Sequence, residues 1–324
     1  EANITVTTKD QNKTATCKIY VMPQNAKFGK CGDNAWWKFN NGVFTVWGNG
    51  AVTDTSGFSA YKTKTTSVVV EKGITEVGGF YGFTALENIE IMDGVEKIKE
   101  SAFKSCKNLK QIELPESITK IGQDAFRDCT GVSYIKIGSP KCEYASGFGV
   151  FSGMGSSEGV TVEFGEKVTE IPRLMLGAQV RTVKFDGKVK KIGNYAFYGW
   201  SNLGEIELPE SVEEIGNGAF IDCAKLSSIT VGENVTKIGS AAFNGCRGLK
   251  KVIMNARLEE ENAAFETAGN GEMEVIYGQG ITKIGRLFCG SKIQKVEIPE
   301  GVETIEESAF KSCKNLKQIE LPES

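Results

Sequence analysis

Two short motifs carry residue types that other proteins use for covalent catalysis. Ser101 precedes Lys104 by three residues and Ser308 precedes Lys311 by the same spacing, an arrangement seen in serine nucleophiles activated by lysine. The chain repeats a unit of about 23 residues, which is described below. The same two positions of other units hold unrelated pairs: Asp124 with Arg127, Tyr195 with Tyr198, and Ala241 with Asn244. Because catalysis needs fixed residue types, we interpret these positions as scaffold surface and predict no catalytic residue.

Paired carboxylates are a second candidate for catalysis. Glu205 and Glu207 resemble the acid pair of glycosidases, and Glu259–Glu261 form an acidic run that could attract a cation. Glu205 and Glu207 fall at positions that every repeat fills with some polar residue. The run Glu259–Glu261 is most simply explained as part of a solvated surface. The glycines in residues 147–155 do not continue into a phosphate-binding motif. A carboxylate glycosidase is therefore kept only as an alternative, and we predict no cofactor and no metal site.

Histidine is absent from the 324 residues. This absence removes the side chain best suited to proton transfer near neutral pH and the commonest metal ligand. Ser-His-Asp triads, Cys-His dyads and imidazole-bound zinc sites are thereby excluded.

Five of the nine cysteines recur at one position of a repeat: Cys106, Cys129, Cys223, Cys246 and Cys313. A compact apolar side chain suits such a buried position, so we predict free structural thiols. Disulfides between neighbouring turns, Cys106 with Cys129 or Cys223 with Cys246, are the alternative. The remaining cysteines, Cys17, Cys31, Cys142 and Cys289, lie off this register, and an odd total leaves at least one thiol unpaired.

The overall charge is nearly balanced, with 38 Lys and Arg against 41 Asp and Glu and a formal net charge of −3. Nucleic acid and anionic membranes attract proteins with a clear basic excess, so neither is an expected partner. No apolar run approaches the length needed to span a bilayer. The chain begins at Glu1, without Met, so we expect a processed or trimmed segment whose signal and anchor lie outside it.

These candidate groups all sit on a repeat of about 23 residues. Residues 109–131 give the pattern L-x-x-I-x-L-P-x-x-I-x-x-I-G-x-x-A-F-x-x-C-x-x. A large apolar residue marks each turn: Phe80, Phe103, Phe126, Phe151, Leu176, Phe197, Phe220, Phe243, Phe265, Phe288 and Phe310. Residues 307–324 also repeat residues 100–117 letter for letter, nine periods later. Such self-similarity is the signature of a solenoid.

Each repeat unit decodes into two short strands and a tight turn. Ile112 and Leu114 alternate with polar residues, as in a half-buried strand, and Ile118 with Ile121 supplies a second extended segment. Ala125 and Phe126 are expected to begin a short helical turn. One unit alone cannot bury enough apolar surface to offset its ordering, so the units must stack. We therefore predict a β-rich (α+β) solenoid: a right-handed superhelix of about eleven turns with parallel sheets, short helical turns and a buried phenylalanine ladder.

The repeat pattern resembles the BspA-like leucine-rich repeat family of bacterial surface proteins. Residues 29–50, which include Trp36, Trp37 and an Asn40-Asn41-Gly42 turn, resemble the hairpin cap that precedes such repeats. Residues 4–21 resemble the last two strands of a bacterial immunoglobulin-like group 2 domain. The expected domains are residues 1–22 (terminal strands or linker), 23–67 (β-hairpin cap) and 68–324 (solenoid). The resemblance implies an extracellular, cell-surface protein used in adhesion or ligand binding.

The repeat loses its regularity between Gly138 and Gln179, and we place a candidate ligand site there. Two turns are longer, Pro172 replaces the glycine at the bend, and a glycine-rich insertion is expected to protrude as a mobile loop. The candidate ligand-binding residues are Tyr134, Lys136, Phe148, Arg181 and Lys184. An aromatic side chain among cations suits an acidic glycan or an acidic protein segment. Repeat decay without functional consequence is the competing interpretation.

The leading functional hypothesis is a non-enzymatic binding or adhesion module, monomeric, that presents its surface to an extracellular protein or glycan. A structural spacer of a cell-wall protein is the first alternative. A binder should interrupt the repeat with a local cluster of unusual exposed side chains, whereas a spacer needs none.

Overall fold

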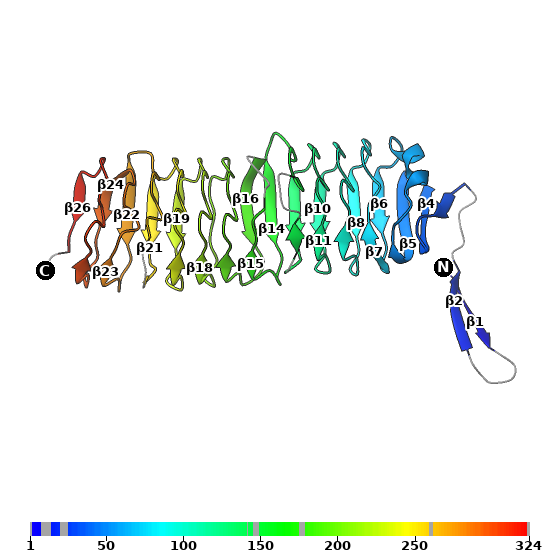
Figure 1. Cartoon of the computed structure of the whole chain (residues 1–324), viewed down its shortest axis with the longest axis horizontal. Coiled ribbons are helices and arrows are strands. Elements are labelled where there is room, and N and C mark those ends of the chain that lie inside the picture. Colours follow the sequence, from blue (N-terminus) through cyan, green and yellow to red (C-terminus); the bar gives the residue numbers. More distant parts are fainter. Residues whose placement is uncertain are drawn as a thin grey trace.

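The chain folds into a rod of about 12 stacked turns (Figure 1). The computed structural model describes residues 2–7, 14–19, 25–140, 142–144, 149–174, 179–258 and 262–322. Successive turns pair through parallel strands on two sides of the rod. The predicted β-solenoid with parallel sheets is therefore confirmed.

The first side of the rod carries the longer strands. They are β6 (Ser67–Val70), β8 (Asn88–Ile91), β10 (Gln111–Leu114), β12 (Tyr134–Ile137), β14 (Val160–Phe164), β16 (Val180–Phe185), β19 (Ser228–Val231), β21 (Lys251–Met254), β22 (Met273–Tyr277), β24 (Ile293–Glu297) and β26 (Gln318–Glu320). Their apolar residues alternate inward, as Ile112 and Leu114 do in β10. The outward residues form rows across the turns wherever one strand pairs in register with the next, as β10, β12 and β14 do.

The second side carries much shorter strands. They are β7 (Ile74–Val77), β9 (Lys97–Ile98), β11 (Lys120–Ile121), β13 (Glu143–Tyr144), β15 (Glu170–Ile171), β17 (Lys191–Ile192), β18 (Glu214–Ile215), β20 (Lys237–Ile238), β23 (Lys283–Ile284) and β25 (Thr304–Ile305). Alternating charges line part of this side: Lys191 lies 3.6 Å from both Glu170 and Glu214, and Lys237 lies 3.3 Å from Glu214.

The N-terminal part contains two antiparallel units. Strands β1 (Ala2–Thr7) and β2 (Thr14–Ile19) pair only with each other, and their assignment to an immunoglobulin-like domain stays a prediction. Strands β3 (Lys27–Lys30), β4 (Asn34–Asn40) and β5 (Val43–Ala51) form the next unit. The predicted hairpin is present, with Asn41 and Gly42 both at positive φ, as a two-residue turn requires. Strand β5 also pairs in parallel with β6 and β7, so it starts the stack.

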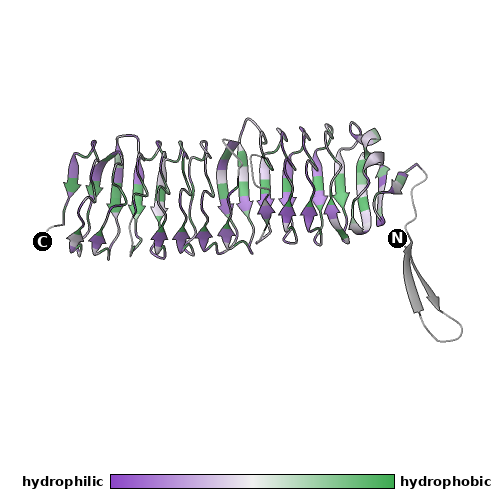
Figure 2. Ribbon diagram, in the orientation of Figure 1, coloured by the Kyte–Doolittle hydropathy of each residue, from purple (hydrophilic) through white to green (hydrophobic). Residues whose placement is uncertain are grey.

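A ladder of buried phenylalanines fills the rod, with one rung per turn. Phe103, Phe126, Phe220 and Phe243 are fully buried, as predicted. Phe103 stacks on Phe126 with 5.4 Å between ring centroids, and Phe220 stacks on Phe243 at 4.9 Å. The hydropathy colouring shows apolar and polar positions alternating along the strands (Figure 2). The ladder begins one turn earlier than predicted, at Phe58 in the 3-10 helix η1 (Ser56–Tyr61).

The predicted helical turns are wrong for the regular repeats. Within the described residues, 3-10 geometry occurs at η1 and at Gln179, and turns without helix stand at the other ladder positions. Seven ladder phenylalanines donate their amide to the next turn, as Phe103 N does to Ala125 O at 2.8 Å. Ser101 and Ser105, on either side of Phe103, also take positive φ angles of 54° and 61°. A helix cannot continue through such residues.

The irregular turn differs from its predicted register. Leu176 lies outside the described residues. Leu174 makes the ladder hydrogen bond instead, from its amide to Ala196 O at 3.4 Å, just as Phe197 does to Ala219 O. The segment from Ile171 to Leu174 is therefore two residues shorter than the equivalent segment of the next turn, from Ile192 to Phe197. The predicted protruding loop covers residues 147–157. Residues 147 and 148 lie outside the described residues, whereas Val150, Phe151 and Met154 are buried.

Candidate functional site

The Ser-x-x-Lys motif does not form a catalytic pair. Lys104 directs its Nζ to Asp124 Oδ2 of the next turn, 2.7 Å away. The hydrogen bond from Lys104 holds the pKa of Asp124 below its usual range. The lysine Nζ is thus engaged with a carboxylate in place of a serine hydroxyl, so the pair lacks the nucleophile–base hydrogen bond that this chemistry needs.

The two acidic candidates of the pair lie at the surface of the rod. Glu205 and Glu207 are exposed and lie in a segment that forms no strand. Glu259–Glu261 lie outside the described residues. Within the described ranges, no three Cys, Asp or Glu side chains converge as metal ligands, and no helix is long and apolar enough to cross a membrane.

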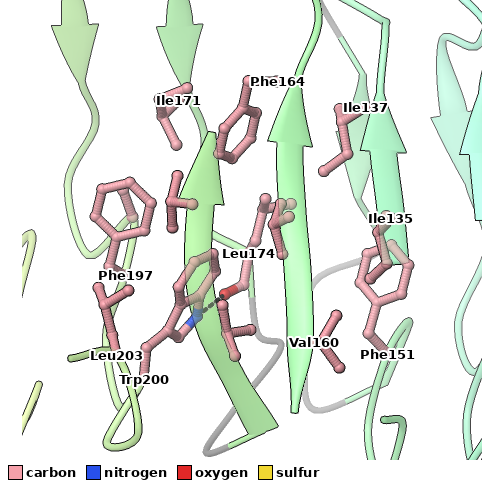
Figure 3. Close-up of a cluster of buried hydrophobic side chains, with 14 of the residues drawn as sticks. Ile135, Ile137, Phe151, Val160, Phe164, Ile171, Leu174, Phe197, Trp200 and Leu203 are labelled. Atoms are coloured by element: carbon pink, nitrogen blue, oxygen red, sulfur yellow. Dashed lines mark hydrogen bonds between the residues drawn. The ribbon is translucent and has the colours of Figure 1, made fainter. Parts of the chain in front are cut away.

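The repeat cysteines donate hydrogen bonds along the rod. Each Sγ reaches the carbonyl oxygen of the ladder phenylalanine one turn earlier: Cys106 to Phe80, Cys129 to Phe103, Cys223 to Phe197, Cys246 to Phe220 and Cys313 to Phe288, at 3.0–3.2 Å. The four thiols at 106, 129, 223 and 246 are free and buried. Trp200 stands three residues after Phe197, at the repeat position of these cysteines. Its Nε1 donates to Leu174 O at 3.1 Å (Figure 3).

The first side of the rod brings part of the predicted ligand site together. Strands β12, β14 and β16 place Tyr134 in register with Thr161 and Thr182, and Lys136 in register with Glu163 and Lys184. Phe148 lies outside the described residues. The row formed by Tyr134, Lys136, Glu163, Arg181 and Lys184 is called the charged row below.

Carboxylates that the sequence analysis missed neutralise Lys136. Its Nζ contacts Glu163 Oε1 at 2.5 Å and Asp186 Oδ2 at 2.9 Å, and these two hydrogen bonds raise the pKa of Lys136. Burial, with Glu163 alongside, raises the pKa of Tyr134 to about 12. The predicted group of three available cations therefore reduces to two, Arg181 and Lys184.

Arg181 reaches the surface through an irregularity in strand pairing. Val160 pairs with Val180 and Thr161 with Thr182, so Arg181 is an extra residue at a bulge and is exposed beside Thr182. Its side chain lies over Gly159, and its Nη2 donates to Ser157 O at 3.2 Å. The bulge therefore aims the guanidinium along the edge of the charged row.

An acidic cleft adjoins the charged row. It encloses about 490 Å³, and its lining residues include Asp93, Glu113, Glu116, Glu166 and Asp186 together with Lys136. An acidic ligand would meet repulsion on this side. The side of the row that carries Arg181 and Lys184 is thus the one that fits a negative group.

A second cluster of exposed side chains was not singled out from the sequence. Tyr195 and Tyr198 are 41% and 40% exposed, with ring centroids 6.3 Å apart. The guanidinium carbon of Arg173 lies 5.4 and 5.8 Å from the two ring centroids. The available signal was Tyr195, at a position that other repeats fill with small or charged residues, followed three residues later by Tyr198.

Comparisons with known proteins place the repeat in a defined family. A family model described as a BspA type leucine rich repeat region matches residues 54–175, 174–287 and 282–324. The chain is similar to the solved structure of a leucine-rich repeat protein from Bacteroides ovatus (19% identity, 98% of this chain and 93% of that chain covered, TM-score 0.40). It is also similar to a leucine-rich repeat protein from Eubacterium ventriosum (21% identity, 92% and 85% covered, TM-score 0.36) and to a leucine rich cell surface protein from Faecalibacterium prausnitzii (20% identity, 95% and 96% covered, TM-score 0.33). No curated protein matches the chain.

Proposed function

Since this chain belongs to the BspA type leucine-rich repeat family, we propose that it is a non-enzymatic binding module that works outside a bacterial cell. A solenoid offers its partners an extended, rigid surface on which exposed positions can vary while the core stays fixed. The ligand we propose is a protein segment or glycan that carries negative charge.

The observation that carries the proposal is the break in the repeat along the charged row. The neighbouring strands present Gln111 and Glu113 before it, whereas β12 and β16 present Tyr134, Arg181 and Lys184. A spacer has no need of such a change, and a bulge is a common way to re-aim a side chain beside a functional site.

Arg181 and Lys184 would make the principal contacts. Both are exposed, and a guanidinium can bind a carboxylate or sulfate through two parallel hydrogen bonds. Lys136 would act indirectly, because its contacts with Glu163 and Asp186 hold that carboxylate pair in place. Tyr134 would add a half-buried aromatic surface beside them.

An array of sulfated and sialylated glycans and of extracellular matrix proteins tests the proposal. We expect the wild-type chain to bind at least one acidic probe, and the double variant Arg181→Ala, Lys184→Ala to lose about tenfold or more in affinity. The matched control is Lys190→Ala, which removes an exposed cation from the second side of the rod, where it pairs with Glu213. Binding that is unchanged in the double variant would refute the charged row as the site.

A structural spacer is the second candidate, favoured by one observation. A single connected core of buried side chains runs from Cys31 to Ala309 and would keep the rod stiff. Absence of binding across the array would favour this candidate. Hydrolysis of any glycan on the array would instead favour the glycosidase alternative.

A further inference from the structure

An aromatic–arginine patch on the edge of the rod, formed by Arg173, Tyr195, Tyr198 and Ile221, has no role in the core. The two tyrosine rings stand at 81° to each other, and Arg173 lies over both. Ile221 is half-buried beside Tyr195, since a Cβ added at Gly218 would lie 2.6 Å from Tyr195 Cε1 and 2.8 Å from Ile221 Cδ1. The patch belongs to the turns of the rod and not to the charged row on its first side.

Tyr195 occupies a backbone position that disfavours it. The residue two before the ladder phenylalanine has positive φ in several turns, where it is Ser101, Asp124, Gly218, Ala241 or Ser308. Tyr195 has φ 56° at this position, and a bulky aromatic residue in the left-handed region is uncommon and strained. The chain thus retains a strained residue whose side chain is 41% exposed, and strain of this kind concentrates at functional sites.

The next turn leaves room for the tyrosine. Gly218 follows Tyr195 at the equivalent position, and any side chain there would collide with the ring. The backbone does not itself demand glycine, because Ala241 takes the same position one turn later with φ 54°. The glycine therefore serves the placement of Tyr195.

The composition of the patch fits a protein partner. Tyrosine and arginine are the residue types that dominate binding energy at protein interfaces. The guanidinium of Arg173 already covers a face of each ring, which leaves less open aromatic face for a flat sugar, while Ile221 extends the apolar surface. Arg173 is exposed, contacts the rings, and has no ion-pair partner among the described residues, so its charge is available to a carboxylate.

We propose that the aromatic–arginine patch binds an acidic, extended segment of a partner protein. A carboxylate of the segment pairs with Arg173, and an apolar side chain packs against Tyr195, Tyr198 and Ile221. This second site does not depend on the charged row. A patch of four side chains suits a short segment held with micromolar affinity.

Selection of a phage-displayed library of random 12-residue peptides on the immobilised full chain tests the proposal. The enriched peptides should share an Asp or Glu close to a large apolar residue. Fluorescence polarisation with one such synthetic peptide should then show about tenfold or greater loss of affinity for Arg173→Ala and for Tyr195→Ala. Gly218→Ala should weaken binding similarly, because it displaces the Tyr195 ring while all four patch side chains remain.

Tyr81→Ala is the matched control. Tyr81 is 51% exposed, directly follows its ladder phenylalanine as Tyr198 does, and has a single cation, Lys62, over its ring at 5.2 Å. We expect Tyr81→Ala and the charged-row double variant to bind the peptide as the wild type does. We expect the patch variants to keep the melting temperature of the wild type, which shows that they fold. Three outcomes would overturn the proposal: no enrichment, enriched peptides that lack acidic residues, or equal binding to Arg173→Ala. Patch-dependent binding of acidic glycans in place of peptides would also overturn it.

Discussion

In six turns, a hydrogen-bonding side chain three residues after the ladder phenylalanine ties one turn to the previous one. Five cysteine thiols and the indole of Trp200 all donate to the carbonyl of the preceding rung. The sequence pattern indicated a compact apolar residue here, and burial confirms that part. It could not reveal the donor, because thiol and indole share no obvious sequence likeness and their acceptor is a backbone atom 26 residues away.

Trp200→Phe tests whether the donor matters. The change keeps a buried aromatic ring but removes the N–H that reaches Leu174 O. We expect a loss of about 1–3 kcal/mol in the free energy of unfolding, measured by urea denaturation, because a buried carbonyl loses its donor. Met154→Leu, at the same position of an earlier turn and without a donor, should cost less than about 1.5 kcal/mol. Equal effects of the two changes would mean that the position only fills space.

The ladder thiols should make stability depend on alkaline pH. Burial raises the pKa of the Cys106 thiol from 9.0 to about 12. The folded chain therefore holds this proton more tightly than the unfolded chain, so the contribution is complete below about pH 9 and is lost as pH rises towards 12. Between pH 8 and 11, the melting temperature of Cys106→Ser should fall less steeply than that of the wild type. Parallel curves would contradict the burial of a protonated thiol.

Among the elements, the phenylalanine rungs should differ in importance with their number of neighbours. Phe126 is fully buried between Phe103 and Phe151, with ring centroids 5.4 and 5.7 Å away. Phe126→Ala should destabilise the chain by about 3–5 kcal/mol, whereas Phe310→Ala, at a half-buried rung, should cost less. Denaturation followed by circular dichroism measures both. A comparable cost for the two changes would show that stacking between turns contributes little.

The strands could be predicted from the sequence, because apolar and polar residues alternate along them. Elements that depend on hydrogen bonds between turns could not be predicted. Ile112 and Leu114 identified β10 correctly. The helical turn after Gly122 was predicted wrongly, because the amide of Phe126 donates to Val150 O of the next turn.

The candidate site depends on register in the same way. A step of 25 residues between Phe126 and Phe151 would place Lys136 beside Thr161, yet the strands pair it with Glu163, 27 residues away. The carboxylates that neutralise Lys136 were missed for this reason. The extra residue at Arg181 shifts the register again, and nothing in the local sequence marks that bulge.

At the scale of the whole molecule, the rod has a weaker middle. In the described residues, pairing is interrupted on the first side between β8 and β10 and between β16 and β19, and on the second side between β13 and β15 and between β20 and β23. Only in the middle do breaks on both sides fall in neighbouring turns. Leu174 also replaces an aromatic rung between Phe151 and Phe197. In a repeat protein, stability depends on the contacts between neighbouring turns, so a weak junction divides the stack into two cooperative units.

Hydrogen exchange measured by mass spectrometry should detect this division. Peptides covering residues 200–210 should exchange faster than peptides covering residues 116–138, because their amides have fewer partners in adjacent turns. Urea denaturation should likewise show two transitions. A single transition with uniform protection along the rod would mean that the junction couples the two halves as tightly as any other.

The identity of residues 100–117 and 307–324 has a genetic consequence. Recombination between the two coding stretches would remove nine whole repeats and leave an open reading frame, because the joined chain has the same sequence as residues 1–117. No strand, rung or turn would be interrupted at the junction. With neighbouring strands about 4.8 Å apart, the rod would shorten by about 43 Å. Repeats of this kind let a lineage change the reach of its protein in whole steps without evolving a new fold.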